Sequence, residues 1–343
     1  MNYDCVIATR NRISALRMSV PLILKQDVLP GRLIIVDSSD GHEAVKSEVT
    51  NICSANNFGN LIVVKADAPS SSRQRNIGLR HVVAPIVMFP DDDSMWFGGF
   101  ASSVLSVYEA DIEQAVGGVV GVATLQPPPE LQQTYKPGKA AIIKRAVQPV
   151  RNYAEAYLAP KPFELIARST WTKPIGIVDN LNVKRVETLA GFRMTFRTGL
   201  VKDIGFDETL GYGLGYCLYE DMDMALGIQK RGFAIVSAER AKVFHHVFPA
   251  KRANWFNYGF IQIVNYIYIY RKSAEGNKSF YGYLERYLLY RFAIYALRLY
   301  SRYGRDAFLG AWAAWGNRKK LLDVELAELP NAYMALCDEY IRR

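Results

Sequence analysis

The sequence contains few cysteines, and its apolar residues form no long uninterrupted run. The four cysteines among 343 residues are scattered and lack metal-site spacing, which fits reduced thiols. No stretch approaches the roughly 18 consecutive apolar residues of a membrane-spanning helix. The best candidate, Phe260–Tyr270, is interrupted by Gln262 and Asn265. The first twenty residues include Asp4 and three arginines, so we expect no signal peptide and a cytoplasmic protein.

Charge is distributed unevenly along the chain. The net charge is +9, from 42 basic and 33 acidic residues. Residues 1–239 hold 25 of each sign, whereas residues 240–343 hold 17 basic and 8 acidic residues. The excess therefore lies in the last third of the chain. It indicates an anionic partner, for which membrane lipid, a lipid pyrophosphate and nucleic acid are the candidates.

The first half alternates short apolar runs with longer mixed segments. We expect strands at residues 3–8, 33–36, 61–65, 86–89 and 116–123, with helices at 12–25, 42–55, 72–81 and 97–110. This order predicts an α/β fold with a parallel, doubly wound sheet, whose ligands bind at the carboxyl ends of the strands. Three polar clusters fall at those ends: Thr9–Arg12, Asp37–Asp40 and Asp91–Asp93.

The second half is less regular. Residues 126–188 are rich in proline and predict a long excursion. We expect a strand at 192–196, a helix at 219–231, short strands at 235–236 and 243–244, and mostly helix after 251. The predicted organisation is one domain over 1–250 and a helical, basic C-terminal region over 251–343.

Two acidic clusters could carry chemistry. In extended chain, Asp91 and Asp93 point to the same side, and carboxylate pairs of this kind suit Mg²⁺ or Mn²⁺. A solvated turn that caps the next helix is the alternative for this cluster. Glu220 and Asp221 open a predicted helix, where an acid either caps the helix or serves as a general base.

Histidines and basic residues supply the other candidates. One histidine of the pair His245-His246 could complete a metal site begun by Asp93, although such a histidine is more often a surface or core residue. Arg73 and Arg75 lie in the first turn of a helix capped by serines, an arrangement that favours an anion such as pyrophosphate. An ordinary surface helix is the alternative. The loop with Thr9, Arg10 and Arg12 offers donors that could reach a nucleotide.

These segments together resemble the family 2 glycosyltransferases of GT-A fold. The resemblance rests on six loose motifs in the right order over about the first 250 residues. They are Val6–Arg12, Ile35–Asp40, Ser72–Leu79, Phe89–Asp93, Phe206–Glu208 with Tyr219–Met224, and Phe244-His245. The chain departs from the family by lacking a Q-x-x-R-W motif, which argues against a processive synthase, and by the length of residues 126–188.

The resemblance implies a single inverting displacement that uses a nucleoside diphosphate sugar, with UDP as the first candidate. Asp91, Asp93 and His245 would hold Mg²⁺ or Mn²⁺, and Asp221 would deprotonate the acceptor hydroxyl, with Glu220 in reserve. The donor would be bound by the remaining site residues, namely Thr9, Arg10, Arg12, Asp37, Arg73, Arg75, Asp91 and Asp92.

The C-terminal region combines arginine with aromatic residues. Residues 258–303 hold 11 of the 21 tyrosines, and residues 251–320 hold 13 basic and three acidic residues. On one continuous helix, Arg291, Arg298 and Arg302 would share a solvent face, opposite Leu289, Phe292, Ala293, Ala296 and Tyr300. Packing on the domain would explain this pattern by itself. Residues 251–320 could also attach the protein to the inner, anionic face of a membrane.

Three functions remain in view. The first is a metal-dependent glycosyltransferase that acts on a glycan or a lipid-linked acceptor in bacterial surface-polysaccharide assembly. The second is a non-catalytic module that binds nucleotide or membrane on the same fold. The third is a sugar-nucleotide nucleotidyltransferase, which the absence of glycine from Ala8–Ser14 disfavours. We do not expect nucleic acid as the partner.

Overall fold

A computed structural model describes residues 1–132, 161–171, 183–214, 217–246, 248, 254–274 and 277–341. The chain forms two compact units. Unit 1 comprises Met1–Tyr135, Thr170–Glu208 and Glu220–Pro249, and unit 2 comprises Lys136–Ser169, Thr209–Tyr219 and Ala250–Arg343. The division into domains at residue 250 stays a prediction.

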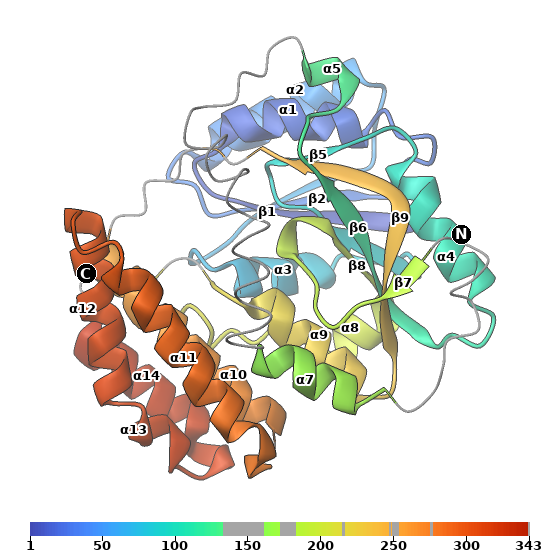
Figure 1. Cartoon of the computed structure of the whole chain (residues 1–343). Coiled ribbons are helices and arrows are strands. Elements are labelled where there is room, and N and C mark those ends of the chain that lie inside the picture. Colours follow the sequence, from blue (N-terminus) through green and yellow to red (C-terminus); the bar gives the residue numbers. More distant parts are fainter. Residues whose placement is uncertain are drawn as a thin grey trace. The chain divides into compact units, whose positions relative to one another are not determined.

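Unit 1 is a mixed α/β structure with a central sheet flanked by helices, as expected (Figure 1). Its strands are β1 (Tyr3–Thr9), β2 (Leu33–Asp37), β3 (Leu61–Lys65), β4 (Ile86–Phe89), β5 (Ser94–Trp96), β6 (Val116–Thr124), β7 (Val183–Arg185), β8 (Met194–Arg197) and β9 (Ala234–His245). Its helices are α1 (Ile13–Ile23), α2 (His42–Ala55), α3 (Ser71–Leu79), α4 (Phe100–Ala110), α5 (Pro129–Gln132), the 3₁₀ turn η1 (Gly191–Arg193), α8 (Thr198–Ile204) and α9 (Glu220–Lys230).

The strand order is β3-β2-β1-β4-β8-β6-β9-β5, with β7 paired to β9. Strands β3, β2, β1 and β4 are parallel, as are β6 and β9. Strand β8 runs antiparallel to both β4 and β6, and β5 runs antiparallel to β9. The two short strands expected at 235–236 and 243–244 are wrong, because β9 is one long strand that pairs with β6 across register shifts.

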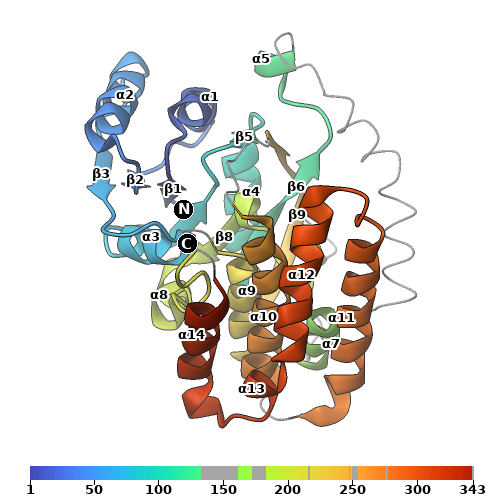
Figure 2. The same ribbon diagram turned by 90° about the vertical axis from the view of Figure 1, so that its left-hand side faces the viewer.

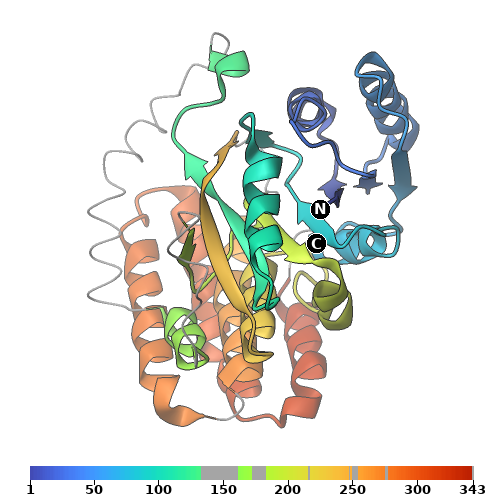
Figure 3. The same cartoon turned by 90° about the vertical axis from the view of Figure 1, so that its right-hand side faces the viewer.

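Side chains alternate between the two faces of the sheet and build two cores. Cys5 and Ile7 of β1 face the core that includes residues of α1, α2 and α4, whereas Val6 faces the core that includes residues of α3, α8 and α9. Figure 3 shows α4 lying along β9. Gly78 lets α3 approach β1 closely, since a Cβ there would lie 2.3 Å from Val6 Cγ1. The carboxyl ends of β1, β2 and β4 are thereby fixed at one edge.

The described part of unit 2 is mostly helical, and its C-terminal region is helical as predicted (Figure 2). Its helices are α7 (Pro162–Ser169), α10 (Trp255–Ala274), the 3₁₀ turn η2 (Lys278–Phe280), α11 (Tyr281–Ala296), α12 (Arg302–Gly316), α13 (Lys319–Leu322), the 3₁₀ turn η3 (Leu326–Glu328) and α14 (Leu329–Tyr340). Across the described residues, none of the helices combines the length and apolar character that crossing a membrane requires.

The continuous helix expected through residues 289–302 is wrong. Helix α11 ends at Ala296, and Ser301 starts α12 by accepting the Gly304 N–H at 3.1 Å. Arg291 is only partly exposed, because it donates to Gln262 and lies over the Tyr295 ring at 5.7 Å. Tyr300, expected on the packed face, is 85% exposed.

The expected excursion at 126–188 lies mostly outside the described residues. Within it, the structure describes 126–132, 161–171 and 183–188, which contain α5, α7 and β7.

Candidate metal and catalytic site

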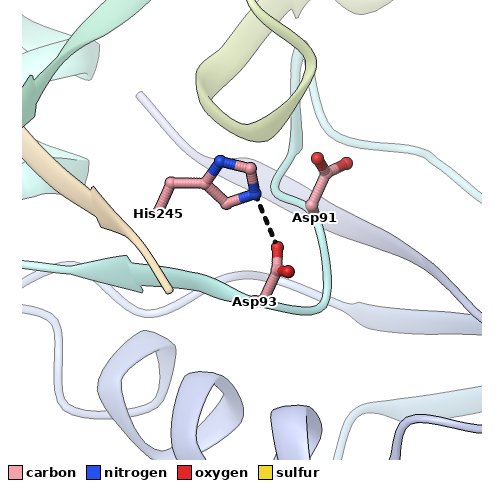
Figure 4. Close-up of side chains that lie close together, drawn as sticks. All are labelled: Asp91, Asp93 and His245. Carbon is pink, nitrogen blue, oxygen red and sulfur yellow. Dashed lines mark ion pairs between the residues drawn. The ribbon is translucent and has the colours of Figure 1, made fainter. Parts of the chain in front are cut away.

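The acidic cluster Asp91–Asp93 follows β4 directly and leads into β5. Because β5 pairs antiparallel with β9, Ser94 lies opposite His245, more than a hundred residues later in the chain. The pairing sets His245 Nε2 3.0 Å from Asp93 Oδ1 (Figure 4). His246 instead donates its backbone N–H to the Asp93 carbonyl oxygen at 3.0 Å. Of the two adjacent histidines, His245 is therefore the one whose ring faces the cluster.

Asp91, Asp93 and His245 are suited to hold a divalent cation. Each offers one ligand atom, and these atoms all lie within 4.8 Å of one another. Two carboxylates and an imidazole nitrogen form a donor set that fits Mg²⁺ or Mn²⁺. Burial opposes ionisation of Asp93, but the hydrogen bond and charge of His245, together with Arg12, outweigh burial and lower the pKa of Asp93. This carboxylate is therefore charged at neutral pH.

Asp92 holds the loop after β1 next to the acidic cluster through hydrogen bonds. It is 3% exposed and accepts hydrogen bonds from Thr9 Oγ1 at 2.8 Å and Arg12 Nη1 at 2.6 Å. Arg12 Nη2 also lies 3.1 Å from Asp93. Burial, only partly offset by Arg12, raises the pKa of Asp92 to about 7. Thr9, Arg12 and Asp92, predicted as donor contacts, thus lie together and bond to one another.

The carboxylate of Asp37 is fully buried. One of its oxygens accepts from the backbone N–H of Ser39 at 2.9 Å and from the Ser39 hydroxyl, and the other lies 2.9 Å from His42 Nδ1. Both oxygens of this carboxylate, predicted to contact a nucleoside, therefore have hydrogen-bond partners within the protein. The side chain of His42, 13% exposed, lies at the surface of this arrangement.

The loops after β1 and β2 are joined to each other. The Asn11 backbone N–H donates to Ser39 Oγ at 2.6 Å, and the Asn11 side-chain amide pairs with Asp40 in both directions, at 2.9 and 3.1 Å. Arg10, between Thr9 and Asn11, is exposed. The two loops that were predicted to receive the nucleotide are thus hydrogen-bonded to each other.

Arg75 connects the two acidic segments. Its side chain is 5% exposed and lies 2.9 Å from Asp91 and 2.6 Å from Glu220. Gln74 anchors the same helix by donating to the Thr9 and Val36 carbonyls at 2.9 and 2.7 Å. Arg73 makes different contacts, with Asp67 and Glu208. The structure therefore unites Arg75 with the acidic cluster and gives Arg73 separate partners.

Asp221 is held as an acceptor at the start of α9. Its Oδ2 accepts the Gly191 N–H at 2.8 Å, and its Oδ1 accepts the Met222 N–H at 2.8 Å. Burial and the neighbouring Glu220 charge raise the pKa of Asp221 to about 7. A methyl group built on Gly191 would lie 3.8 Å from Asp221 Oδ2 and 3.9 Å from Asp91 Oδ2. Asp91, Asp221 and Arg75, whose Nη2 would lie 3.4 Å from that methyl group, thus all adjoin Gly191.

Sequence reasoning missed the contribution of η1. Gly191 bonds to Asp221, and the ring of Phe192 stacks on His245 with centroids 4.5 Å apart and planes 8° apart. The Phe192 carbonyl also accepts from Ser94 Oγ at 2.7 Å. One turn therefore contacts both the candidate base and the candidate metal ligand. Its only sequence signal was a glycine next to an aromatic residue.

Several solved structures share the fold of this chain. A mannosyltransferase, PcManGT of Pyrobaculum calidifontis, in complex with GDP-Man and Mn²⁺, aligns with a TM-score of 0.53 and 15% identity over 99% of this chain and 87% of its own. S. aureus TarS 1–349 with UDP-GlcNAc aligns at 0.56 and 13% identity, over 99% and 91%. GalNAc-T7 with UDP, GalNAc and Mn²⁺ aligns at 0.54 and 11% identity, over 99% and 58%.

At these identities the likeness concerns the fold, which is that of the GT-A glycosyltransferases. A search among curated proteins gives no match. The family comparison is specific: residues 2–258 match the family described as Glycosyltransferase like family 2. That match covers well over half of the chain and all of the acidic, basic and histidine residues of the site. The chain belongs to glycosyltransferase family 2.

Proposed function

We propose that this glycosyltransferase moves a sugar from a nucleoside diphosphate sugar to an acceptor hydroxyl, with inversion at the anomeric carbon. The observation that carries the proposal is that Asp91 and Asp221 both lie next to Gly191, and that Asp91 also belongs to a three-residue set of candidate metal ligands. A cation-binding group and a general base at one place are what a one-step displacement needs.

Asp221 is the proposed base. Gly191 and Met222 bind its two oxygens and leave its remaining lone pairs for the acceptor hydroxyl. A pKa of about 7 matches a base that must take up a proton near neutral pH. Glu220 is less suited, because it pairs with Arg75 at 2.6 Å and also accepts from Ser71 at 3.2 Å.

Asp91, Asp93 and His245 are the proposed metal ligands. A bound Mg²⁺ or Mn²⁺ would supply positive charge for the departing nucleoside diphosphate. Arg75 is positioned to hold Asp91 in place and to add cationic charge at the same location. Asp92, Thr9 and Arg12 would keep the loop after β1 in the conformation that receives the donor.

The solved relatives suggest the donor class. PcManGT holds GDP-Man with Mn²⁺, and TarS holds UDP-GlcNAc. We extend the proposal to a UDP or GDP sugar, with a uridine nucleotide tested first. On the acceptor side we propose a glycan or lipid-linked hydroxyl in surface-polysaccharide assembly. Residues 251–320 would attach the enzyme to the inner, anionic face of a membrane.

The experiment compares UDP, GDP, dTDP and CMP by thermal shift, each with and without Mn²⁺, followed by sugar transfer from the matching donor. We expect one nucleotide to raise the melting temperature only when Mn²⁺ is present. Product configuration, measured by NMR, should be opposite to that of the donor. Asp221→Asn should keep the metal-dependent shift and lose transfer, whereas Asp203→Asn, an exposed acid on α8, should keep both.

Three outcomes would overturn the proposal. Binding without any transfer across donors and acceptors would indicate the non-catalytic module. Retention of anomeric configuration would exclude the single displacement. Full transfer by Asp221→Asn would remove Asp221 as the base.

A further inference from the structure

Helix α12 packs with its small residues inward and presents large ones to solvent. Its buried positions are Gly304, Ala307, Gly310, Ala311 and Ala314. Its large residues Tyr303, Leu309 and Trp312 are 63%, 54% and 60% exposed. An ordinary helix of a globular protein shows the reverse, with its large apolar side chains in the core. The large apolar side chains that α12 exposes therefore indicate a surface that binds a partner.

The close packing of α12 against α10 prevents the large residues from turning inward. A Cβ on Gly259 would lie 1.9 Å from the Ala307 carbonyl oxygen, and one on Gly310 would lie 1.9 Å from the Phe256 carbonyl oxygen. The two backbones therefore touch, and no space remains between them for Leu309 or Trp312. Phe292 of α11 makes edge contacts with Phe308, Trp312 and Trp315 at 6.1, 6.1 and 5.5 Å, which fixes the rotation of α12 further. Trp312 thus has one contact with α11 while 60% of its surface stays exposed.

The turn between α11 and α12 extends the same exposed surface. Leu297, Leu299 and Tyr300 are 73%, 40% and 85% exposed. At 100° per residue, Arg302, Arg305, Leu309 and Trp312 fall within an arc of about 80° on α12. We call the exposed residues of this region the α11–α12 corner, which consists of Leu297, Arg298, Leu299, Tyr300, Arg302, Tyr303, Arg305, Leu309 and Trp312.

The charge of the α11–α12 corner has one sign. The sequence from Arg286 to Arg305 holds five arginines, with single acids, Glu285 and Asp306, on either side of it. Arg298, Arg302 and Arg305 are exposed among the leucines and tyrosines. Surfaces that lie at the headgroup level of a bilayer combine exposed leucine, tyrosine and tryptophan with arginine.

We propose that the α11–α12 corner is the surface by which the protein binds an anionic lipid bilayer. Leu309 and Trp312 would enter the boundary between headgroups and acyl chains, while the three arginines contact lipid phosphates. A protein partner would need a complementary acidic face, whereas a bilayer supplies anionic charge and apolar depth together. The inference deepens the proposed acceptor side, and its test uses neither donor nor metal, so the two proposals can fail separately.

The test measures binding of the full-length protein to vesicles by co-sedimentation. The vesicles are phosphatidylcholine alone, or with phosphatidylglycerol as about one third of the lipid. Arg298→Gln/Arg302→Gln/Arg305→Gln removes the charge, and Leu309→Ser/Trp312→Ser removes the apolar part. All five side chains are exposed, so both variants should fold, which circular dichroism checks.

Matched controls use exposed residues of unit 1. Ile112→Ser/Val83→Ser removes apolar side chains that are 90% and 68% exposed. Arg80→Gln/Lys184→Gln/Arg240→Gln removes three exposed positive charges. If net charge alone directed binding, this triple variant would weaken it as much as the arginine variant of the α11–α12 corner.

We expect wild type to bind the anionic vesicles and not the neutral ones. Because each basic residue near an anionic surface contributes about 1 kcal/mol, the arginine variant should bind about 100-fold more weakly. The Leu309/Trp312 variant should also lose binding, and both controls should retain it. The proposal would be overturned by equal binding to neutral vesicles, by no binding, or by equal losses in the controls. A dimer that Leu309→Ser/Trp312→Ser dissociates, without vesicle binding, would overturn it in favour of a second copy.

Discussion

The ring of Phe192 lies flat against the ring of His245, with centroids 4.5 Å apart and planes 8° apart. The carbonyl of Phe192 is itself anchored by Ser94, the residue opposite His245 in the β5–β9 pairing. The imidazole is therefore restrained on one side by its strand partner and on one face by an aromatic ring. Its Nε2 is left pointing at Asp93.

Replacing Phe192 by leucine should weaken metal binding without removing a ligand. Aromatic contacts of this kind contribute about 0.5–1.5 kcal/mol, so we expect Mn²⁺ affinity to fall about 3- to 10-fold. Isothermal titration with Mn²⁺ measures this, and Phe192→Tyr, which keeps the stacked ring, is the control. Equal affinity in the leucine variant would show that the strand pairing alone orients His245.

Asp93→Ala should abolish metal-dependent nucleotide binding. This carboxylate is 3% exposed, lies 3.0 Å from His245 and belongs to the only three-residue ligand set found among the described residues. The measurement is the melting-temperature shift on adding nucleotide and Mn²⁺. Asp203→Asn, on the exposed side of α8, should leave the shift unchanged. An unchanged Mn²⁺-dependent affinity in Asp93→Ala would refute the ligand assignment.

Transfer activity should fall as the pH falls through about 7. Burial and the charge of Glu220 raise the pKa of Asp221 to about 7, and only the deprotonated carboxylate can accept the hydroxyl proton. At about pH 6 roughly one tenth of the enzyme would hold the active form, so kcat/KM should be about tenfold below its plateau at higher pH. A pH profile of kcat/KM tests this, and a flat profile between pH 5.5 and 8 would contradict it.

Arg75→Gln should destabilise the protein far more than Arg73→Gln. Arg75 is 5% exposed and balances Asp91 and Glu220, so its loss leaves buried carboxylates uncompensated, at about 3–5 kcal/mol. Arg73 is 41% exposed, so solvent screens its pairing with Asp67 and its loss should cost much less than the loss of Arg75. Urea denaturation of the metal-free protein gives both values. Similar losses for the two variants would mean that Arg75 is not the electrostatic link between the acidic segments.

Local patterns in the sequence were sufficient for the first half of the sheet. The apolar run Leu33–Val36 and the polar residues after it predicted both a buried strand and a site at its carboxyl end. The acidic cluster after β4 was identified for the same reason. That a histidine of the pair could join Asp93 was raised from the residue types, and the resemblance singled out His245. Their pairing leaves no local periodic signal, because the two strands are far apart in the sequence.

Other features depend on tertiary contacts that composition does not encode. The antiparallel insertion of β8 between β4 and β6 is one of these, and it brings η1 with Gly191 to the site. The partial burial of Arg291 is another. Helical periodicity placed Arg291 on the solvent face of one continuous helix, but that helix breaks between Ala296 and Arg302. The contacts of Asp37 with Ser39 and His42 were not predicted either, and its contact with the donor stays a prediction.

Successive side chains of β9 point to opposite faces of the sheet. The chemistry of the site therefore depends on the register in which β9 pairs with β5. Phe244 packs with Leu22 and Met95 on one face of the strand, and His245 turns to the other face, toward Asp93. A slip of one residue in the β5–β9 register would turn His245 to the opposite face and place Phe244 or His246 opposite Ser94. The position of the imidazole is therefore set by the register of β9, a strand that lies between β6 and β5 inside the sheet.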